Sequence, residues 1–251
     1  MTRYEIMGCP VDSDDIAQTI LKIERHIAER TLCQHVVVNV SKFVEMQKNQ
    51  GFKAIINRCD IINADGMPIV WAARLLGTPL SSRVAGVDLF QALIRVCDQK
   101  KYKPFFFGAE QWVVEHMVSA FQKQYPTLQV AGFRNGYYSE HEESDIAKEI
   151  KNSGADMLFV GFSSPKKEQF LNRWIPEMGV PFCMGVGGSF DVIAGKTKRA
   201  PGWMQHSGLE WLYRIYQEPR RMWKRYAKTN PAFIWMLMKA LARKKKTSAA
   251  S

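Results

Sequence analysis

Short apolar runs that end at glycine, asparagine or aspartate recur through the first 190 residues, and segments with helical periodicity lie between them. Strands that alternate with helices in this way are typical of a parallel sheet covered by helices. The six runs are HVVVNV (35–40), DIINAD (60–65), KPFFFG (103–108), TLQVAGF (127–133), ADMLFVGF (155–162) and VPFCMGVG (180–187). The sequence therefore predicts an α/β fold with an open, mostly parallel, Rossmann-like sheet and flanking helices.

The composition narrows the class of protein. A chain of 251 residues with 46% hydrophobic residues can bury a large core, which excludes a disordered protein. The five cysteines form no CxxC pair and are expected to be reduced thiols, which is typical of a cytoplasmic chain. The first 15 residues turn acidic before an apolar stretch develops, so we expect no signal peptide. No run of 18 apolar residues predicts a membrane-spanning helix.

The net charge of +11 is concentrated at one end of the chain. Residues 196–251 contain 14 lysines and arginines but only two acidic residues, whereas residues 1–195 are nearly neutral. Such a local block of charge favours an anionic partner, either lipid or nucleic acid. We expect an α/β catalytic domain over residues 1–200 and a basic, aromatic-rich helical appendage over residues 201–251, which Pro219 and Pro231 divide into short helices.

Ligands of open α/β sheets bind beyond the carboxyl ends of the strands, so the polar residues there are candidates for a site. They are Asn39, Asn63, Asp65, Gly66, Gly108, Gly161 to Lys167 and Gly185 to Asp191. In NADG (63–66), Asp65 could take a proton from a hydroxyl nucleophile, or it could cap the following helix.

Two further segments could bind phosphate groups. In SSPKKEQF (163–170), two lysines beside a helix N-terminus suit a diphosphate, although a solvated first turn would look the same. GVGGSFDVIAG (185–195) could direct backbone N–H groups at a nucleotide, or it could be a tight turn from strand to helix. It matches neither GxGxxG nor a P-loop.

DSDD (12–15) contains a DxD triplet of the kind that can hold a metal, but it precedes an amphipathic helix, so we expect it to cap that helix. The five histidines show no metal-ligand spacing, and no serine stands in GxSxG. The sequence therefore predicts neither a bound metal nor a cofactor.

In order and spacing, five segments resemble the WecG/TagA/CpsF family of bacterial glycosyltransferases. They are INADGMPIVWAARLLG (62–77), SRVAGVDLF (82–90), GFSSPKKE (161–168), GVGGSFDVIAGKTKRAP (185–201) and GLEWLYRIYQEPRRMWKRY (208–226). The resemblance implies an inverting transfer, without a metal, of a sugar from a UDP-sugar to a polyprenyl-diphosphate-linked saccharide in cell-surface polysaccharide synthesis. It leaves open whether the sugar is N-acetylmannosamine, its uronic acid or glucose.

The resemblance also assigns roles to residues. It makes Asp65 the general base, Asn39 a polar pocket residue and Arg83 a cation that contacts substrate, and it places the rest of the pocket in 163–168 and 185–191. An inverting transfer without a metal also needs positive charge for the departing diphosphate. The substrate-binding candidates are therefore Asn39, Arg83, Lys166, Lys167, Gly187, Gly188, Asp191, Arg214, Arg221 and Arg225.

Two departures from the family pattern bear on the sugar pocket. The common SPKQE reads SPKKE here, so Lys167 stands in place of a glutamine, and Ser163 stands where glycine is common. Val37 and Val38 precede Asn39, where some members carry threonine. These changes leave the donor sugar undetermined.

A polyprenyl-linked acceptor lies in a membrane, so the appendage is expected to hold the enzyme at the cytoplasmic face of the inner membrane. Its tryptophans and the stretch FIWMLM (233–238) supply apolar contacts, and Lys244 to Lys246 and the arginines attract anionic lipids. Alternatively, the earlier aromatics could pack on the sheet. Nucleic-acid binding and UDP-sugar epimerisation are competing functions without a supporting motif, and a homo-oligomer is left open.

Overall fold

The computed structural model describes residues 2–80 and 83–249, apart from the side chains of residues 206, 221 and 245–249. A parallel sheet of six strands forms its centre, in the order β4-β3-β8-β7-β5-β6. The strands are β3 (Cys33–Val38), β4 (Ile61–Ala64), β5 (Pro104–Gly108), β6 (Gly132–Arg134), β7 (Met157–Gly161) and β8 (Phe182–Gly185). Each lies in one of the six apolar runs or overlaps its end, so the predicted fold class is confirmed.

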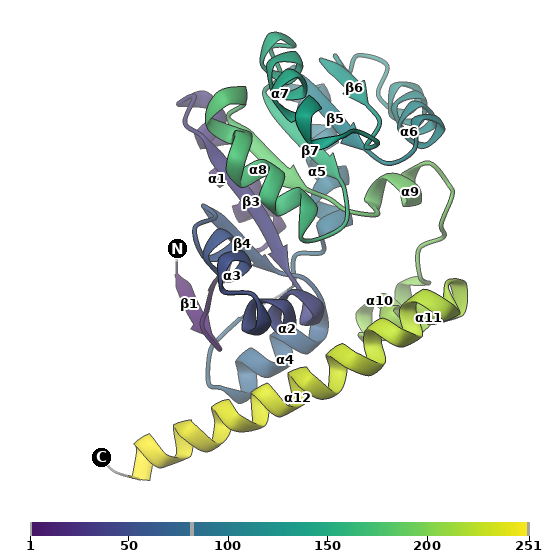
Figure 1. Cartoon of the computed structure of the whole chain (residues 1–251). Coiled ribbons are helices and arrows are strands. Elements are labelled where there is room, and N and C mark those ends of the chain that lie inside the picture. Colours follow the sequence, from purple (N-terminus) through teal and green to yellow (C-terminus); the bar gives the residue numbers. More distant parts are fainter. Residues whose placement is uncertain (1, 81–82, 250–251) are drawn as a thin grey trace.

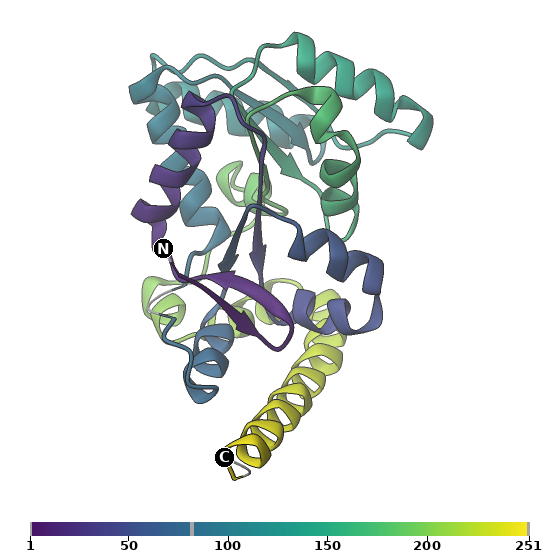
Figure 2. The same ribbon diagram turned by 90° about the vertical axis from the view of Figure 1, so that its left-hand side faces the viewer.

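Helices cover both faces of the sheet (Figures 1 and 2). One face packs against α1 (Ile16–Ala28), α5 (Gly86–Lys100), α6 (Gln111–Gln124) and α9 (Ser189–Ile193). The other packs against α2 (Val40–Lys48), α3 (Gln50–Asn57), α4 (Met67–Leu75), α7 (Glu143–Asn152) and α8 (Lys166–Met178), with the short 3-10 helix η1 (Glu140–Glu142) before α7.

The strand β5 shows why the runs are apolar throughout. Phe106 is buried on the face of α5 and α6, whereas Phe105 and Phe107 are buried on the face of α7 and α8. A strand covered on both faces needs apolar residues at successive positions, because none of its side chains reaches water. The run 127–133 differs, because Leu128 enters the core before the three-residue edge strand β6 begins.

An N-terminal hairpin was not predicted. β1 (Arg3–Ile6) pairs antiparallel with β2 (Cys9–Asp12), and Met7 and Gly8 both have positive φ between them. A two-residue turn of this kind usually contains asparagine or aspartate before glycine, so Met7 gives no turn signal. The hairpin buries Ile6, Cys9 and Val11 beside β4 and α3.

The C-terminal region forms α10 (Gly202–His206), α11 (Glu210–Gln217) and α12 (Pro219–Ala249). Pro219 starts α12, as predicted, but the expected break at Pro231 is wrong because the helix continues through it. Proline removes one backbone hydrogen bond, and the contacts of α12 with α2 compensate, with Phe233 only 5% exposed and 6.0 Å from the ring of Phe43.

That contact also corrects the interpretation of FIWMLM, because Phe233 belongs to the core. The α12 helix then extends past α2 and α4 at the end of the sheet where β3 terminates (Figure 1). Within residues 2–80 and 83–249, no helix is both long enough and apolar enough to cross a membrane.

Candidate active site

The carboxyl ends of the strands form one edge of the sheet, which we call the carboxyl edge. Along it, β4, β3, β8 and β7 present the residues that follow each strand in that order. The chain leaves β5 toward β6 and leaves β7 in the opposite direction toward β8. Neighbouring strands that diverge in this way create a crevice at the carboxyl edge, which is where ligands of open α/β sheets bind.

Asp65 lies at the carboxyl end of β4 and is half-buried. The N-cap of α4 is Gly66, which has φ of 100°, so Asp65 does not act as the cap that its sequence position allowed. Among the described residues, no hydrogen-bond donor contacts its carboxylate. Burial raises the pKa of Asp65, the Glu210 carboxylate raises it further, and Arg214 and Arg83 act against this rise. A carboxylate with a raised pKa and no donor is suited to accept a proton.

Glu210 holds two of the predicted cations near Asp65. Its side chain pairs with Arg83 Nη1 at 3.4 Å and with Arg214 Nη2 at 3.6 Å. Arg83 lies in the connection between α4 and α5, whereas Glu210 and Arg214 lie one turn apart on α11. The structure therefore brings Arg83 and Arg214 together at Asp65, although 131 positions separate them in the sequence.

The two asparagines at the strand ends have structural contacts. The Asn39 side chain accepts a hydrogen bond from the backbone N–H of Lys42 at 3.1 Å and so caps α2 at the carboxyl edge. Asn63 is fully buried, and its Oδ1 lies 2.9 Å from Nε2 of His35 and 3.5 Å from Oγ1 of Thr19. Asn63 therefore faces the core rather than a ligand.

Three charged side chains form a buried group at the ends of β3 and β8, which we call the lysine–glutamate cluster. Glu168 Oε1 lies 2.9 Å from Lys42 Nζ and 2.8 Å from Lys167 Nζ, and it accepts a hydrogen bond from Ser164 Oγ at 2.8 Å. The side chains of Lys42, Lys167 and Glu168 are 6%, 7% and 3% exposed. The absence of a side chain at Gly185 makes room for Lys167.

The charges of this cluster shift the pKa values of its members. Burial opposes ionisation of Glu168, but Lys42 and Lys167 lower its pKa to about 2. Burial, with the charge of Lys42, lowers the pKa of Lys167 to about 8. Lys42 was not among the predicted site residues, since only burial distinguishes it from the other lysines of an amphipathic helix. Glu168 lies in the predicted pocket segment 163–168.

Lys166 points away from its neighbour Lys167. Its ammonium lies 3.8 Å from the ring centroid of Tyr138 and 5.4 Å from that of Phe162. It also lines a hollow of about 230 Å³ at the crevice between β5 and β7. The other lining residues are Ala109, Gly136, Tyr137, Gly161, Phe162 and Ser163.

The segment 185–191 forms a turn from β8 into α9. Gly187 has φ of 57°, which favours glycine, and Gly188 is the N-cap of α9. Asp191 follows in the first turn and lies 3.8 Å from Lys196. The predicted tight turn is therefore present, next to the crevice at the carboxyl edge.

Two of the predicted substrate-binding arginines, Arg221 and Arg225, lie on α12. Arg225 Nε donates a hydrogen bond to Ser41 Oγ at 2.8 Å, which attaches α12 to the first turn of α2. The positive charge of Arg225 also contributes to the lowered pKa of Lys167. The side chain of Arg221 lies outside the part of the chain that the structure describes.

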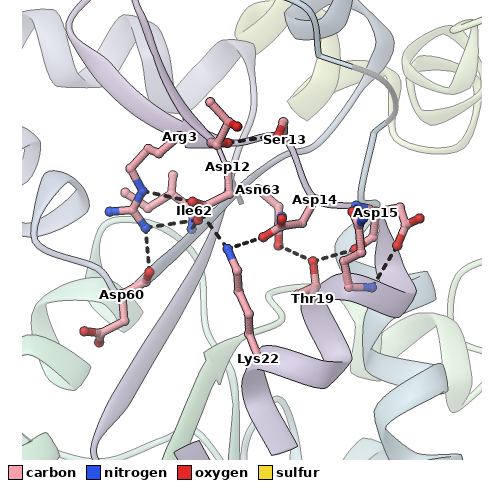
Figure 3. Close-up of polar contacts among 12 residues, drawn as sticks. Arg3, Asp12, Ser13, Asp14, Asp15, Thr19, Lys22, Asp60, Ile62 and Asn63 are labelled. Carbon is pink, nitrogen blue, oxygen red and sulfur yellow. Dashed lines mark hydrogen bonds and ion pairs between the residues drawn. The ribbon is translucent and has the colours of Figure 1, made fainter. Parts of the chain in front are cut away.

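The acidic triplet lies in a separate group, the N-terminal charge cluster of Arg3, Asp12, Asp14 and Lys22 (Figure 3). Arg3 donates two hydrogen bonds to Asp12, at 2.9 and 3.0 Å, and Lys22 contacts both Asp12 and Asp14. Burial opposes ionisation of Asp12, but the hydrogen bonds from Arg3 and from the Ile62 N–H keep its pKa below the ordinary value.

Asp15, the last residue of DSDD (12–15), caps α1, in line with the capping role expected for this segment. Its side chain accepts a hydrogen bond from the backbone N–H of Gln18 at 2.8 Å, and the Gln18 side chain accepts one from the Asp15 N–H. Within the described ranges, no three acidic, histidine or cysteine side chains are grouped as metal ligands would be.

Known proteins resemble this chain over almost its full length. Residues 4–247 match the model of the "Glycosyl transferase WecG/TagA/CpsF family". A Bacillus spizizenii (strain W23) protein named N-acetylglucosaminyldiphosphoundecaprenol N-acetyl-beta-D-mannosaminyltransferase is 34% identical over 204 residues, which cover 81% of this chain and 78% of that protein.

Proteins of the same name from two other bacteria are also similar. The Bacillus subtilis (strain 168) protein is 32% identical over 226 residues, or 90% of this chain and 87% of its own. The Staphylococcus aureus (strain MW2) protein is 29% identical over 248 residues, which cover 97% of this chain and 95% of that protein. Since the family model spans nearly the whole sequence and two relatives exceed 30% identity, this chain belongs to the WecG/TagA/CpsF family of glycosyl transferases.

Proposed function

We propose that this chain is an inverting glycosyltransferase that moves a sugar from a UDP-sugar to a polyprenyl-diphosphate-linked saccharide, with Asp65 as the general base. The observation that carries the proposal is the environment of Asp65. It lies at the carboxyl edge, its pKa is raised by burial and by Glu210, and no described donor contacts it. It takes the proton of the acceptor hydroxyl as that oxygen attacks the anomeric carbon.

The donor nucleotide is assigned to the crevice between β5 and β7. The hollow there has a cation, Lys166, and an exposed aromatic ring, Tyr137, which suit a phosphate and a base respectively. Three strand-to-strand steps of about 4.8 Å separate β7 from β4, about 14 Å in all. An extended UDP-sugar laid along the carboxyl edge therefore directs its sugar toward Asp65.

The departing UDP carries negative charge, which this chain's own cations stabilise in the proposed reaction. Lys166 lies at the crevice, Lys167 in the lysine–glutamate cluster, and Arg83 and Arg214 at Asp65. Fixed positive charges in a partly buried site stabilise a charged transition state without reorganising during the step. Activity in excess EDTA tests this metal-independent scheme, and its abolition with rescue by Mg²⁺ or Mn²⁺ contradicts it.

The relatives' names guide the choice of substrates. They describe transfer of N-acetylmannosamine to N-acetylglucosaminyl-diphosphoundecaprenol, so N-acetylmannosamine is the proposed sugar. A glucose donor in exopolysaccharide synthesis is the alternative within the same family. Purified protein, a panel of UDP-sugars and a synthetic lipid-diphosphate N-acetylglucosamine, followed by product mass, test the proposal. The product mass should show the addition of one N-acetylhexosamine. Failure to transfer a sugar from any of the UDP-sugars would contradict the proposed function.

We assign membrane docking to the appendage of residues 201–251, with residues 1–200 as the catalytic domain. Trp203 and Trp223 are 66% and 65% exposed, and Trp223 shares one face of α12 with the exposed Ile234 and Met238. The surrounding lysines and arginines add attraction for anionic headgroups of about 1 kcal/mol each near the surface. Exposed apolar side chains flanked by positive charge favour the cytoplasmic face of the inner membrane.

Sedimentation with liposomes that contain anionic lipid tests this assignment. Binding should fall with salt but persist in part, because aromatic insertion is insensitive to salt. Combined Trp223→Ser and Ile234→Ser substitution should remove the salt-resistant part, while Trp112→Ser on α6 serves as an exposed-tryptophan control. Equal binding by all three proteins, or binding to nucleic acid in place of liposomes, contradicts it.

A further inference from the structure

The lysine–glutamate cluster contains an excess positive charge in a nearly dry environment. Lys42 and Lys167 oppose a single carboxylate, that of Glu168, and all three side chains are less than one-tenth exposed. Arg225, on α12, adds to the positive potential at Lys167. A buried charge without a counter-charge is expensive. Such charges cluster at functional sites, where a ligand can supply the counter-charge.

The hydrogen bonds of the cluster are incomplete as well. Among the described residues, Lys42 Nζ has Val37 O at 2.7 Å and Glu168 Oε1 at 2.9 Å. Lys167 Nζ has Ser164 Oγ at 2.6 Å and Glu168 Oε1 at 2.8 Å. An ammonium group has three donors, so each lysine has one left over. Glu168 Oε2 is buried without a partner, which leaves an acceptor free for a hydroxyl group.

The position of the cluster connects it with the reaction. Lys42 follows β3 and Lys167 lies over Gly185 at the end of β8, between Asp65 at β4 and the crevice at β7. The charge of Lys42 acts on Asp65 itself. On the donor path proposed above, this place is occupied by the diphosphate or by the sugar.

We propose that Lys42, Lys167 and Glu168 form a subsite for a negatively charged oxygen of the donor, either of the diphosphate or of a carboxylate on the sugar, and that Lys167 supplies the net charge of this subsite. The inference rests on the proposed function. It depends on Lys167, because this side chain brings a second cation to a single carboxylate.

Calorimetric affinities of uridine, UMP, UDP, UDP-glucose and UDP-glucuronate for the wild type and Lys167→Gln test the inference. Lys167→Gln should weaken binding of the ligand whose anionic oxygen reaches the subsite by about tenfold or more and leave uridine unchanged. A loss that is already present with UDP identifies a diphosphate oxygen, and one confined to UDP-glucuronate identifies a sugar carboxylate. Lys123→Gln, on α6, is the surface control.

A pH series provides a second readout that a merely structural lysine would not produce. Lys167 faces Lys42 on α2, Glu168 on its own helix and Arg225 on α12, and its pKa is about 8. Wild-type affinity for the responsive ligand should therefore fall between pH 7 and 8.5, below the range in which the uracil ring itself ionises, while that of Lys167→Gln stays level.

The outcomes separate this inference from the function on which it rests. Affinities within twofold of the wild type for every ligand, with the same pH dependence in Lys167→Gln, overturn the subsite alone. Failure of the wild type to bind any uridine nucleotide overturns the proposed function and the subsite with it.

Discussion

Two groups of charges that each contain buried carboxylates differ in their balance of charge. The N-terminal charge cluster has two carboxylates and two cations, and each carboxylate lies against a cation (Figure 3). The lysine–glutamate cluster has two cations around one carboxylate. The first fastens the hairpin to α1 and β4, because Asp12 also accepts the Ile62 N–H.

This difference distinguishes charges that stabilise the fold from charges that are available to bind a substrate. A balanced cluster stabilises the folded chain by itself, whereas an unbalanced one is tolerated where function requires it. The balanced group contains Asp12 and Asp14, the two aspartates of the DxD triplet, whose spacing alone resembles a metal site. The unbalanced group lies at the carboxyl edge, where the candidate base Asp65 is also found.

The largest expected effect is that of Asp65→Asn. Loss of the general base should reduce turnover by about 10²–10⁴-fold, with thermal stability close to that of the wild type. Asp14→Asn, the same chemical change in the N-terminal charge cluster, should leave the turnover of the folded protein intact. Initial rates with a soluble acceptor analogue provide the measurement. Normal turnover of Asp65→Asn, or an equal loss in Asp14→Asn, would remove the distinction between the two regions.

Removal of Asp12 should reduce stability rather than catalysis. Asp12→Ala eliminates the contacts with Arg3 and Lys22 and leaves the Ile62 N–H without its acceptor. We expect the free energy of unfolding to fall by about 2–3 kcal/mol, since Arg3 remains partly exposed. Urea unfolding measures this loss. The error of such a comparison is roughly 0.5 kcal/mol. A change in the free energy of unfolding smaller than this error would show that these ion pairs do not stabilise the fold.

Removal of Lys167 should raise the free energy of unfolding, whereas removal of Asp12 should lower it. Its pKa is about 8 in the folded chain and about 10.5 when unfolded, so the unfolded chain binds more protons between these values. The charged lysine therefore destabilises the fold fully below pH 8, and this penalty is relieved as pH rises toward 10.5. Lys167→Gln should raise the free energy of unfolding at pH 7 by about 1–2 kcal/mol.

The same urea experiment at pH 7 and pH 9.5 tests that sign. The advantage of Lys167→Gln should shrink at the higher pH, where the wild-type lysine has lost most of its charge. A less stable variant at pH 7, or an advantage that does not change with pH, contradicts the idea of an unbalanced cluster.

The smallest expected effect is at Asp15, which closes the capping box of α1. Asp15→Ala should lower the free energy of unfolding by about 1 kcal/mol, the usual contribution of an N-cap side chain. Turnover in the presence of EDTA should match that of the wild type. A specific loss of activity at unchanged stability would contradict the purely structural role of Asp15.

Most of the sheet could be predicted because strands buried on both faces must be apolar, as β5 shows with three successive phenylalanines. The hairpin could not, because its turn relies on Met7 with positive φ, which no sequence rule favours. Helix α12 continues through Pro231 because of tertiary contacts at Phe233, and local propensity does not report such contacts.

The candidate site was predictable only in part, for a similar reason. Asp65 follows a strand and could be found from that position alone. Lys42 looks like any lysine of an amphipathic helix, and its role depends on Glu168, 126 residues away in the sequence. Glu210 likewise connects Arg83 with Arg214 only after α11 has folded against the carboxyl edge.

The most direct test of the account is where UDP protects the backbone from hydrogen–deuterium exchange. The donor is proposed to bind at the carboxyl edge, whereas the N-terminal charge cluster stabilises the fold. Saturating UDP should therefore slow exchange in 161–168 and 185–191 and leave 2–22 unchanged. Protection within 2–22, or none at the carboxyl edge under saturating UDP, would contradict the central claim that the unbalanced edge is the substrate site.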